Sequence, residues 1–322
     1  MSLVLGVDSG GTKTLAALAD ESGKVVWLGR SPSLDPSGEA PWPSILQALL
    51  AGIPKLAEVA AAAFGLPFNG EVAAYTAEQE RVVGQMMPAL RVVDNDVRIA
   101  FDGAFAGKSG ALILAGTGSM AWSSLNGPGD PHVRVGGWGD VFGDEGSAFW
   151  IGREALAAVS RELDGRAPNS GFSGAILREL AIDPSELIAW CYGRENRRSA
   201  VAGIAPTVSK LADEDDPTAA AILRSAAAEL ADTLLAAWRR AAGDRPLRWT
   251  YAGGVTASGF LMQRLQERVG RAPVAPRLPP VGGALYRAAL KAGWRVTPAW
   301  LERLDASLRE LSISTASPTL EA

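Results

Sequence analysis

The chain of 322 residues is 48% hydrophobic and 20% charged, and it carries a formal net charge of −4 at pH 7. This composition is typical of a globular protein, and the length exceeds the usual size of one hydrophobic core, so we expect two domains. The negative net charge argues against nucleic acid or an anionic membrane surface as the main partner. No segment approaches the roughly 20 consecutive apolar residues of a membrane span.

Cysteine and histidine are too scarce for several kinds of site. The one cysteine, Cys191, excludes an internal disulfide, a Cys-rich zinc site and an iron–sulfur cluster held by this chain's own thiolates. The one histidine, His132, lies in a turn-like sequence, and we expect it in an exposed loop. The chain enters an apolar strand at once and shows no signal sequence, so we expect a cytoplasmic protein.

The first domain is expected over residues 1–107 and begins with a strand that starts at Leu3. A second strand, Leu15–Ala19, returns from it after a glycine-rich turn. The spacing of apolar residues then predicts an alternation of helices and strands, which indicates a mixed α/β sheet. The predicted elements are a broken helix over Trp42–Phe64, a strand over Glu71–Tyr75, a helix to Ala89, a strand over Leu90–Val93 and a helix over Val97–Phe105.

The second domain is expected over residues 108–322, with its C-terminal helix free to pack back on the first domain. It opens like the first, with a strand, a Gly/Thr turn and a returning strand, which predicts a second domain of similar design. The predicted elements are strands Ala111–Ala115 and Met120–Ser124, a long loop Asn126–Gly146, a helix Ser147–Leu163, mostly helix over Gly174–Ala242, a strand Leu247–Ala252, and helices Gly259–Val269, Val281–Lys291 and Pro298–Leu311.

Four glycine-rich segments follow apolar strands or open a helix: Asp8–Thr12, Gly116–Ser119, Gly253–Ser258 and Gly282–Gly283. In open α/β sheets, ligands bind outside such strand ends. None of these segments has the spacing of a Walker A loop or a dinucleotide fingerprint. The first combines a carboxylate, backbone N–H groups, hydroxyls and a lysine, which suits a nucleotide phosphate and its Mg²⁺. An ordinary hairpin turn with an incidental aspartate is the alternative.

Two further carboxylates are candidates for the chemistry. Asp96 follows a predicted strand, where a general base would project into a cleft between domains, although a solvated loop acid is the alternative. Asp144 precedes a predicted helix, so it is either a site residue or the N-cap of that helix.

Taken together, five segments resemble the N-acetylglucosamine kinase/BadF-BadG-BcrA-BcrD ATPase family of the actin-like ATPase superfamily. The resemblance spans about residues 3 to 290, and its most specific part is Gly136–Ser147. It implies an α/β fold of two ribonuclease H-like domains whose mixed sheets flank a nucleotide and sugar cleft. The other four segments are Asp8–Thr14, Asn95–Asp96, Gly116–Ser119 and Ala252–Val255.

The resemblance also implies an activity, namely transfer of the γ-phosphate of ATP to the 6-hydroxyl of N-acetylglucosamine or glucosamine. Asp96 would be the catalytic base, and Asp8 would hold Mg²⁺ through water. An amino sugar would be the substrate, with no nucleic acid or membrane partner, and a homodimer is compatible with the family. ATP would contact Gly10, Gly11, Thr12, Lys13, Thr117, Gly118, Ala212, Gly253 and Gly254, and the sugar would contact Asp35, Asn95, Ser119, Gly137, Trp138 and Asp144.

One departure from the family concerns the sugar. Many members carry an asparagine that hydrogen-bonds sugar hydroxyls where this chain has Leu34. An unpaired hydroxyl in a closed site costs about 1–3 kcal/mol, so either Asp35 substitutes or the sugar differs from N-acetylglucosamine. The alternative function is a regulatory or activator ATPase on the same fold that phosphorylates no sugar. A dehydratase-type activator needs cysteines for a bridging iron–sulfur cluster, and the chain has only Cys191.

Overall fold

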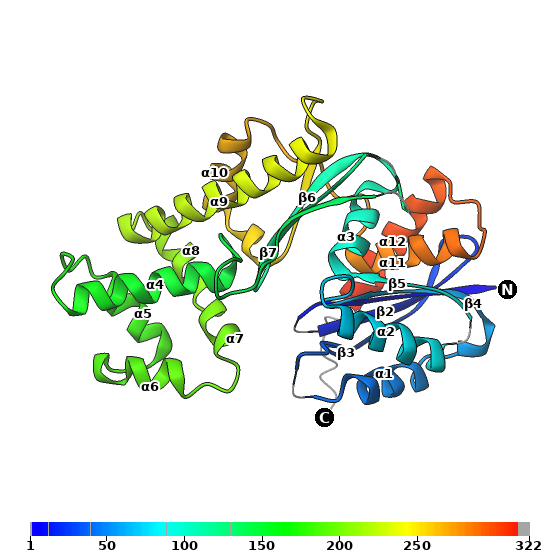
Figure 1. The fold of residues 1–322 in the computed structure, drawn as a ribbon, viewed down its shortest axis with the longest axis horizontal. Helices are drawn as coiled ribbons and strands as arrows, with labels where there is room; N and C mark the ends of the chain where they lie inside the picture. Colours follow the sequence, from blue (N-terminus) through cyan, green and yellow to red (C-terminus); the bar gives the residue numbers. More distant parts are fainter. Residues whose placement is uncertain are drawn as a thin grey trace. The chain divides into compact units, whose positions relative to one another are not determined.

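The computed structural model describes residues 2–314 except Thr12, Glu39, Pro88, Asn126, Gly129 and Asp130. The chain divides into two compact units (Figure 1). The first unit contains Met1–Lys108, Asn126–Asp130 and Ala275–Ala322, and the second contains Ser109–Leu125 and Pro131–Val274. The helices near the C-terminus belong to the first unit and pack on its sheet, a packing that the sequence left open for the C-terminal helix.

The first unit is built on a five-stranded sheet of order β3-β2-β1-β4-β5. Strand β1 pairs antiparallel with β2 and parallel with β4, while β5 pairs parallel with β4. Both predicted strands of the opening hairpin are confirmed, and β3 is a strand that the sequence analysis missed. The strands are β1 (Leu3–Ser9), β2 (Lys13–Asp20), β3 (Val25–Pro32), β4 (Val59–Leu66) and β5 (Leu90–Asn95).

Two predicted elements of the first unit are wrong. Helix α1 (Trp42–Ala51) ends where Gly52 and Pro54 stand, and the alanine-rich stretch after the break is strand β4 instead of a continued helix. A strand buried on both faces has no alternation to distinguish it from a helix, and alanine favours the helical interpretation. The expected strand over Glu71–Tyr75 is also absent, because helix α2 (Ala73–Met86) begins within it.

Each face of this sheet has its own layer of helices, as the two-residue period of a strand requires. Leu3, Leu5 and Val7 pack against α1 on one face. Val4 points to the other face, which is covered by α11 (Pro280–Lys291) and α12 (Pro298–Ser314) (Figure 1).

Helix α11 lies unusually close to its neighbours because glycine stands at the contact points. A Cβ atom on Gly6 of β1 would lie 2.7 Å from the backbone nitrogen of Leu285. A Cβ atom on Gly283 would lie 2.2 Å from the carbonyl oxygen of Ile99 in α3 (Asp96–Phe105) and 2.8 Å from the nitrogen of Gly103. The interpretation of Gly282–Gly283 as a ligand turn is therefore wrong, since these glycines lie inside α11 and permit close helix packing.

The second unit repeats the first four strands of the first unit in order and direction. Its sheet has the order β8-β7-β6-β9, with β6 antiparallel to β7, β7 antiparallel to β8, and β6 parallel to β9. This confirms the expected α/β class with two mixed sheets of similar design. The strands are β6 (Gly110–Ala115), β7 (Ser119–Ser124), β8 (Val133–Gly136) and β9 (Trp249–Ala252).

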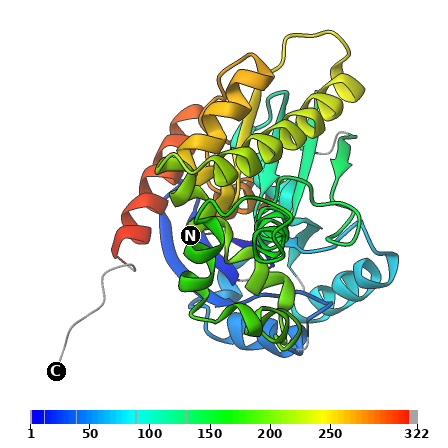
Figure 2. The same cartoon turned by 90° about the vertical axis from the view of Figure 1, so that its left-hand side faces the viewer.

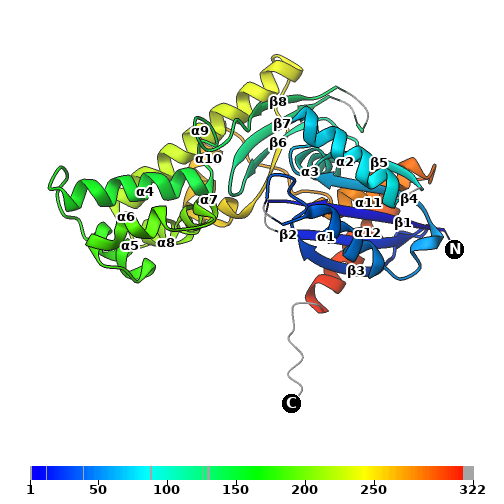
Figure 3. The same cartoon turned by 60° about the horizontal axis from the view of Figure 1, so that its bottom comes forward.

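One core of the second unit joins its sheet to its helices, and α9 lies along β6, β7 and β8 (Figures 2 and 3). Asp216 caps α9, which explains the acidic break seen in the sequence. His132 is half-buried instead of exposed, because its ring packs 4.3 Å from that of Trp122. The helices are α4 (Ala148–Leu163), α5 (Phe172–Leu180), α6 (Leu187–Tyr192), α7 (Arg197–Ala202), α8 (Ala205–Asp213), α9 (Pro217–Ala242) and α10 (Gly259–Val269).

In the part of the chain that the structure describes, no helix combines the length and apolar character needed to cross a membrane. The cleft that the sequence analysis expects between the two domains stays a prediction.

The packing of α11 on α3 predicts the effect of a single methyl group. Gly283→Ala should lower the free energy of unfolding of the first unit by about 1–3 kcal/mol, because the added carbon meets backbone atoms that have no room to move. Denaturant unfolding of the variant measures this loss. Gly52→Ala is the matched control, since its Cβ would have no neighbour closer than 3.5 Å. Equal stability of the two variants would contradict the close contact.

Candidate active site

The glycine-rich turn of the first unit joins β1 to β2. Gly10 donates its N–H to the carbonyl oxygen of Lys13 at 3.0 Å, and a Cβ atom on Gly10 or Gly11 would meet nothing within 4 Å. The turn is thus open to a ligand on its outer side, as a phosphate loop requires. Thr12, expected to contact ATP, lies outside the described residues. The hydroxyls of Ser9 and Thr14 hydrogen-bond each other at 2.9 Å inside the unit.

Two carboxylates near this turn share one electrostatic environment. Burial and, to a lesser extent, the charge of Asp96 together raise the pKa of Asp8 to about 7, while Lys13 opposes this change. Burial also raises the pKa of Asp96 to about 7, with smaller contributions from Glu71 and Asp35. Both aspartates keep part of their surface accessible, so water reaches carboxylates that the surrounding protein desolvates. Structure and charge therefore bring Asp8, Asp35, Glu71 and Asp96 together.

Asp96 is the first residue of α3, and its neighbour Asn95 fixes the start of that helix. The side-chain oxygen of Asn95 accepts the N–H of Val97 at 3.0 Å, which makes Asn95 the N-cap. Its amide nitrogen donates to the carbonyl oxygen of Asn69 at 3.0 Å and to Glu71 at 2.8 Å. Asn95 is buried and all its polar atoms are occupied. Its side chain thus fixes the start of α3, and its expected contact with a sugar stays a prediction.

The loop after β3 places Leu34 away from these acids. Its side chain is fully buried in the core beside β1, and its N–H donates to the Ser9 hydroxyl at 2.8 Å. Asp35 next to it is near enough to Asp96 to raise the pKa of that residue. One oxygen of Asp35 accepts both the N–H and the hydroxyl of Ser37, at 2.7 Å and 2.6 Å. Asp35 is thus a charged group that this loop brings near Asp96.

The matching turn of the second unit, Gly116–Ser119, lies between β6 and β7. The carbonyl oxygens of Gly116 and Thr117 accept the first free N–H groups of α4, those of Ala148 and Phe149, at 2.9 Å and 3.3 Å. Ser147 caps the same helix by accepting the N–H of Trp150. Asp144 is therefore not the cap of this helix, and that alternative for its role is wrong.

Asp144 instead ties three segments together. It is buried, accepts the N–H of Ser119 at 3.1 Å, and pairs with Arg198 of α7 at 2.5 Å. A Cβ atom on Gly118 would lie 2.7 Å from the Arg198 guanidinium, so glycine is needed beside this ion pair. The Ser119 hydroxyl donates to the carbonyl oxygen of Glu145 at 2.7 Å. Sequence analysis missed Arg198, because nothing in the local sequence of α7 marks it.

The loop from Gly136 to Ser147 is held at its base and exposed at its tip. Gly137, at φ +71°, donates its N–H to the carbonyl oxygen of Ser119 at 3.0 Å. Arg134 donates to the Gly137 carbonyl oxygen at 2.8 Å and lies 5.8 Å from the centre of the Trp138 ring. Trp138 itself is 67% exposed. The loop therefore presents an aromatic ring on a fixed base.

Strand β9 ends where Gly253 passes the end of β6. Its φ is +100°, and a Cβ atom there would lie 2.3 Å from the carbonyl oxygen of Ala115, so only glycine fits. Gly254 has open space around it. Ala212, expected to contact ATP, is 3% exposed and packs in the core of α8 with α9 and α10. The expected contact of Ala212 with ATP stays a prediction.

The residues present fit Mg²⁺ only if substrate phosphates complete its ligands. Across the described residues, no three His, Cys, Asp or Glu side chains form a group that could hold a metal ion by themselves. Mg²⁺ in phosphoryl-transfer sites is commonly bound by one or two carboxylates, water and the substrate. Within the same part of the chain, no hydrogen bond occupies the Asp8 carboxylate, which leaves it available for this role.

The repeated sheet, with a glycine turn after the first strand of each unit, defines the duplicated actin-like ATPase class of fold. The chain belongs to the BadF/BadG/BcrA/BcrD ATPase family, whose model matches residues 5–288.

The chain is similar in sequence or structure to several proteins with kinase names. An N-acetylmuramic acid/N-acetylglucosamine kinase of Clostridium acetobutylicum is 29% identical over 239 residues, which cover 71% of this chain and 77% of the relative. A glucosamine kinase of Vibrio cholerae is 26% identical over 256 residues, covering 73% and 80%. A solved structure from Chromobacterium violaceum, assigned as an N-acetylglucosamine kinase, superposes with a TM-score of 0.72 at 27% identity and covers 91% of this chain and 99% of its own.

The raised pKa values of Asp8 and Asp96 predict that these acids reduce stability at neutral pH. A folded-state pKa of about 7, above the ordinary value of 3.8, means that the folded protein holds the proton more tightly than the unfolded chain. Stability therefore falls as the pH rises from about 4 to 7. At pH 8 and without ligands, Asp96→Asn should raise Tm by roughly 2–5 °C, and Asp8→Asn should act in the same direction.

Thermal unfolding at pH 8 and at pH 4.5 checks this expectation. The gain should shrink toward zero at the lower pH, where the wild-type acids are protonated in the folded state. Asp20→Asn, at the end of β2 in the same unit, is the control and should show no such gain. A Tm that drops at pH 8 in both site variants would refute the desolvated state of these carboxylates.

Proposed function

We propose that this ATPase is a hexosamine kinase that transfers the γ-phosphate of ATP to the 6-hydroxyl of an amino sugar, with Asp96 as the base. The observation that carries the proposal is the desolvated Asp96 carboxylate, held at the start of α3 by Asn95 beside Asp8 and the open turn of the first unit. The kinase names of the relatives support a sugar as the acceptor. N-Acetylglucosamine and glucosamine both remain candidate substrates.

Asp96 accepts the proton of the sugar hydroxyl while that oxygen attacks the γ-phosphorus in line. A carboxylate with a pKa near 7 is a stronger base than an ordinary aspartate and is still largely ionised above neutral pH. Mg²⁺, when bound through Asp8, supplies charge neutralisation for the transferring phosphoryl group. Lys13 adds positive charge to the same turn.

The remaining groups bind and orient the substrates. In the proposal, the outer side of the Gly10–Lys13 turn and the Thr117–Gly118 turn contact phosphate, and Gly253 and Gly254 line the adenosine end. Asp35 and the loop of Gly137 and Trp138 contact the sugar, while Asp144 and Ser119 hold that loop in place. Asn95 acts on Asp96, and Ala212 supports the helix behind the nucleotide. The homodimer stays a prediction.

A coupled ADP-release assay tests the proposed activity. The sugars to compare are N-acetylglucosamine, glucosamine, N-acetylmuramic acid and glucose, each with ATP and Mg²⁺. At least one amino sugar should stimulate ADP release, and phosphorus NMR should place the phosphate on the 6-hydroxyl. Asp96→Asn should lower kcat by about 10²–10⁴-fold, since it removes the base. An absence of sugar stimulation, or an unchanged rate in Asp96→Asn, would refute the proposal.

Asp35 provides a second test, specific to the sugar. Asp35→Asn should raise KM for the amino sugar by about tenfold while KM for ATP changes less than about twofold, because only a sugar contact is weakened. Asp20→Asn is the matched control, since Asp20 accepts the N–H and hydroxyl of Ser22 in the same way that Asp35 accepts those of Ser37. Identical KM values in the two variants would exclude Asp35 from the sugar site.

A further inference from the structure

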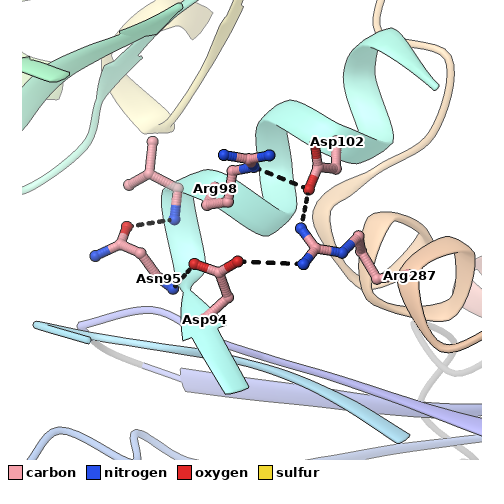
Figure 4. Close-up of polar contacts among 6 residues, drawn as sticks. Asp94, Asn95, Arg98, Asp102 and Arg287 are labelled. Atoms are coloured by element: carbon pink, nitrogen blue, oxygen red, sulfur yellow. Dashed lines mark hydrogen bonds and ion pairs between the residues drawn. The ribbon is translucent and has the colours of Figure 1, made fainter. Parts of the chain in front are cut away.

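A network of charged side chains, most of them buried, joins Asp94, Arg98, Asp102 and Arg287 in the first unit (Figure 4). Arg287 of α11 donates a hydrogen bond from one guanidinium nitrogen to Asp102 of α3. Its other terminal nitrogen donates to Asp94 at the end of β5, at 3.3 Å. Arg98 of α3 also donates to Asp102, at 3.1 Å. The network therefore links three elements, β5, α3 and α11. Asp96 lies where β5 ends and α3 begins.

Such a network is a costly way to fill a protein interior. Arg98 is 2% exposed and Asp102 1%, and burial raises the pKa of Asp102 against the opposing effect of both arginines. Buried ion pairs often contribute less stability than apolar side chains of similar volume would. One oxygen of Asp102 even lacks a hydrogen bond within the described residues. The stability of the fold alone therefore does not explain why charged groups occupy this position.

The connection to Asp96 is short. One oxygen of Asp94 accepts the N–H of Asn95 at 2.9 Å, and the other pairs with Arg287. Asn95 in turn caps α3 at Val97. From the other side, Asp102 lies in α3 itself, less than two turns after Asp96. The planar guanidinium of Arg287 thus fixes the end of β5 and the body of α3 relative to each other.

We propose that Arg287 is a positioning residue that sets the orientation of Asp96 by bridging Asp94 and Asp102. This inference rests on the proposed function, because that proposal makes Asp96 the catalytic base, whose placement then matters. Glycine contacts bring α3 and α11 close together. Arg287 adds directional hydrogen bonds from α11 to α3 and to the end of β5.

The test compares three substitutions of the network. Arg287→Met removes the bridge but leaves the Arg98–Asp102 pair intact and Asp94 partly exposed to water, so the variant is expected to fold. Its kcat should fall by about 10–100-fold while KM for ATP stays within about twofold, since a displacement of about 1 Å is costly for catalysis. Arg287→Lys should recover Tm more fully than kcat, because lysine restores charge but not the two-sided bridge. Arg287→Met combined with Asp94→Asn should be no slower than Arg287→Met alone.

Hydrogen exchange gives a readout that needs no activity. In Arg287→Met, peptides containing Asn95–Arg98 should exchange at least about threefold faster, whereas peptides from α1 should be unchanged. Arg277→Met is the matched control, since it removes an exposed ion pair with Glu302 in the same unit and should leave both exchange and kcat as in the wild type.

The two proposals fail in different ways. Without sugar-stimulated ADP release in the wild type, the proposed function fails, and the exchange data alone decide whether Arg287 fixes the Asn95–Val97 backbone. Unchanged exchange at Asn95–Arg98 in Arg287→Met overturns the positioning role, whatever the activity. A parallel recovery of Tm and kcat in Arg287→Lys also overturns it, because charge neutralisation would then be sufficient.

Discussion

The desolvation of two neighbouring carboxylates, Asp8 and Asp96, is the constraint on which the first unit depends. Each acid raises the free energy of the ligand-free protein at neutral pH, and placing them near each other adds repulsion. The chain nevertheless supplies Asp8 from the end of β1 and Asp96 from the start of α3, two elements of the first unit. A cation bound at Asp8 would relieve the repulsion. The stability that the apo protein gives up is thus available as binding energy for a metal–nucleotide complex.

The two units share a sheet topology but differ in the chemistry they carry. At the glycine turn of the first unit, Asp8 lies near Asp96 and Lys13, and Asp96 lies near two further acids. At the corresponding turn of the second unit, the buried acid Asp144 is neutralised by Arg198, and its oxygens are spent on holding the loop that presents Trp138. The two units therefore share a backbone frame, while the side chains at their glycine turns make different contacts.

Sequence patterns predicted the parts of the fold whose signals are local. The strands that start at Leu3 and Ala111 are apolar runs that end in glycine turns, and the structure has both. Strand β4 escaped prediction because alanine carries no preference strong enough to outweigh its surroundings. In the site, Asp8 and Asp96 were recognisable from their places after strands. Arg198 and Arg287 were not, because their partners lie far away in the chain. Asp144 is 54 residues from Arg198, and Asp102 is 185 residues from Arg287. The burial of Leu34 was equally hidden, since only the fold decides which way a loop side chain points.

Arg287 lies in a segment that follows the second unit in the chain but packs in the first unit. Its sheet is formed by residues up to Asn95, yet α11 and α12, which cover one face, follow the whole of the second unit in the chain. One apolar face of the first unit, which includes Val4, Ala61 and Ile99, therefore lacks its cover until these helices pack on it. The contact joins residues far apart in the chain, and closing so long a loop costs entropy, so we expect it to form late. The same late contact brings Arg287 to Asp102, which until then has only Arg98 to balance its buried charge. The network that we propose to orient Asp96 is therefore complete only when α11 has packed against α3 and the end of β5.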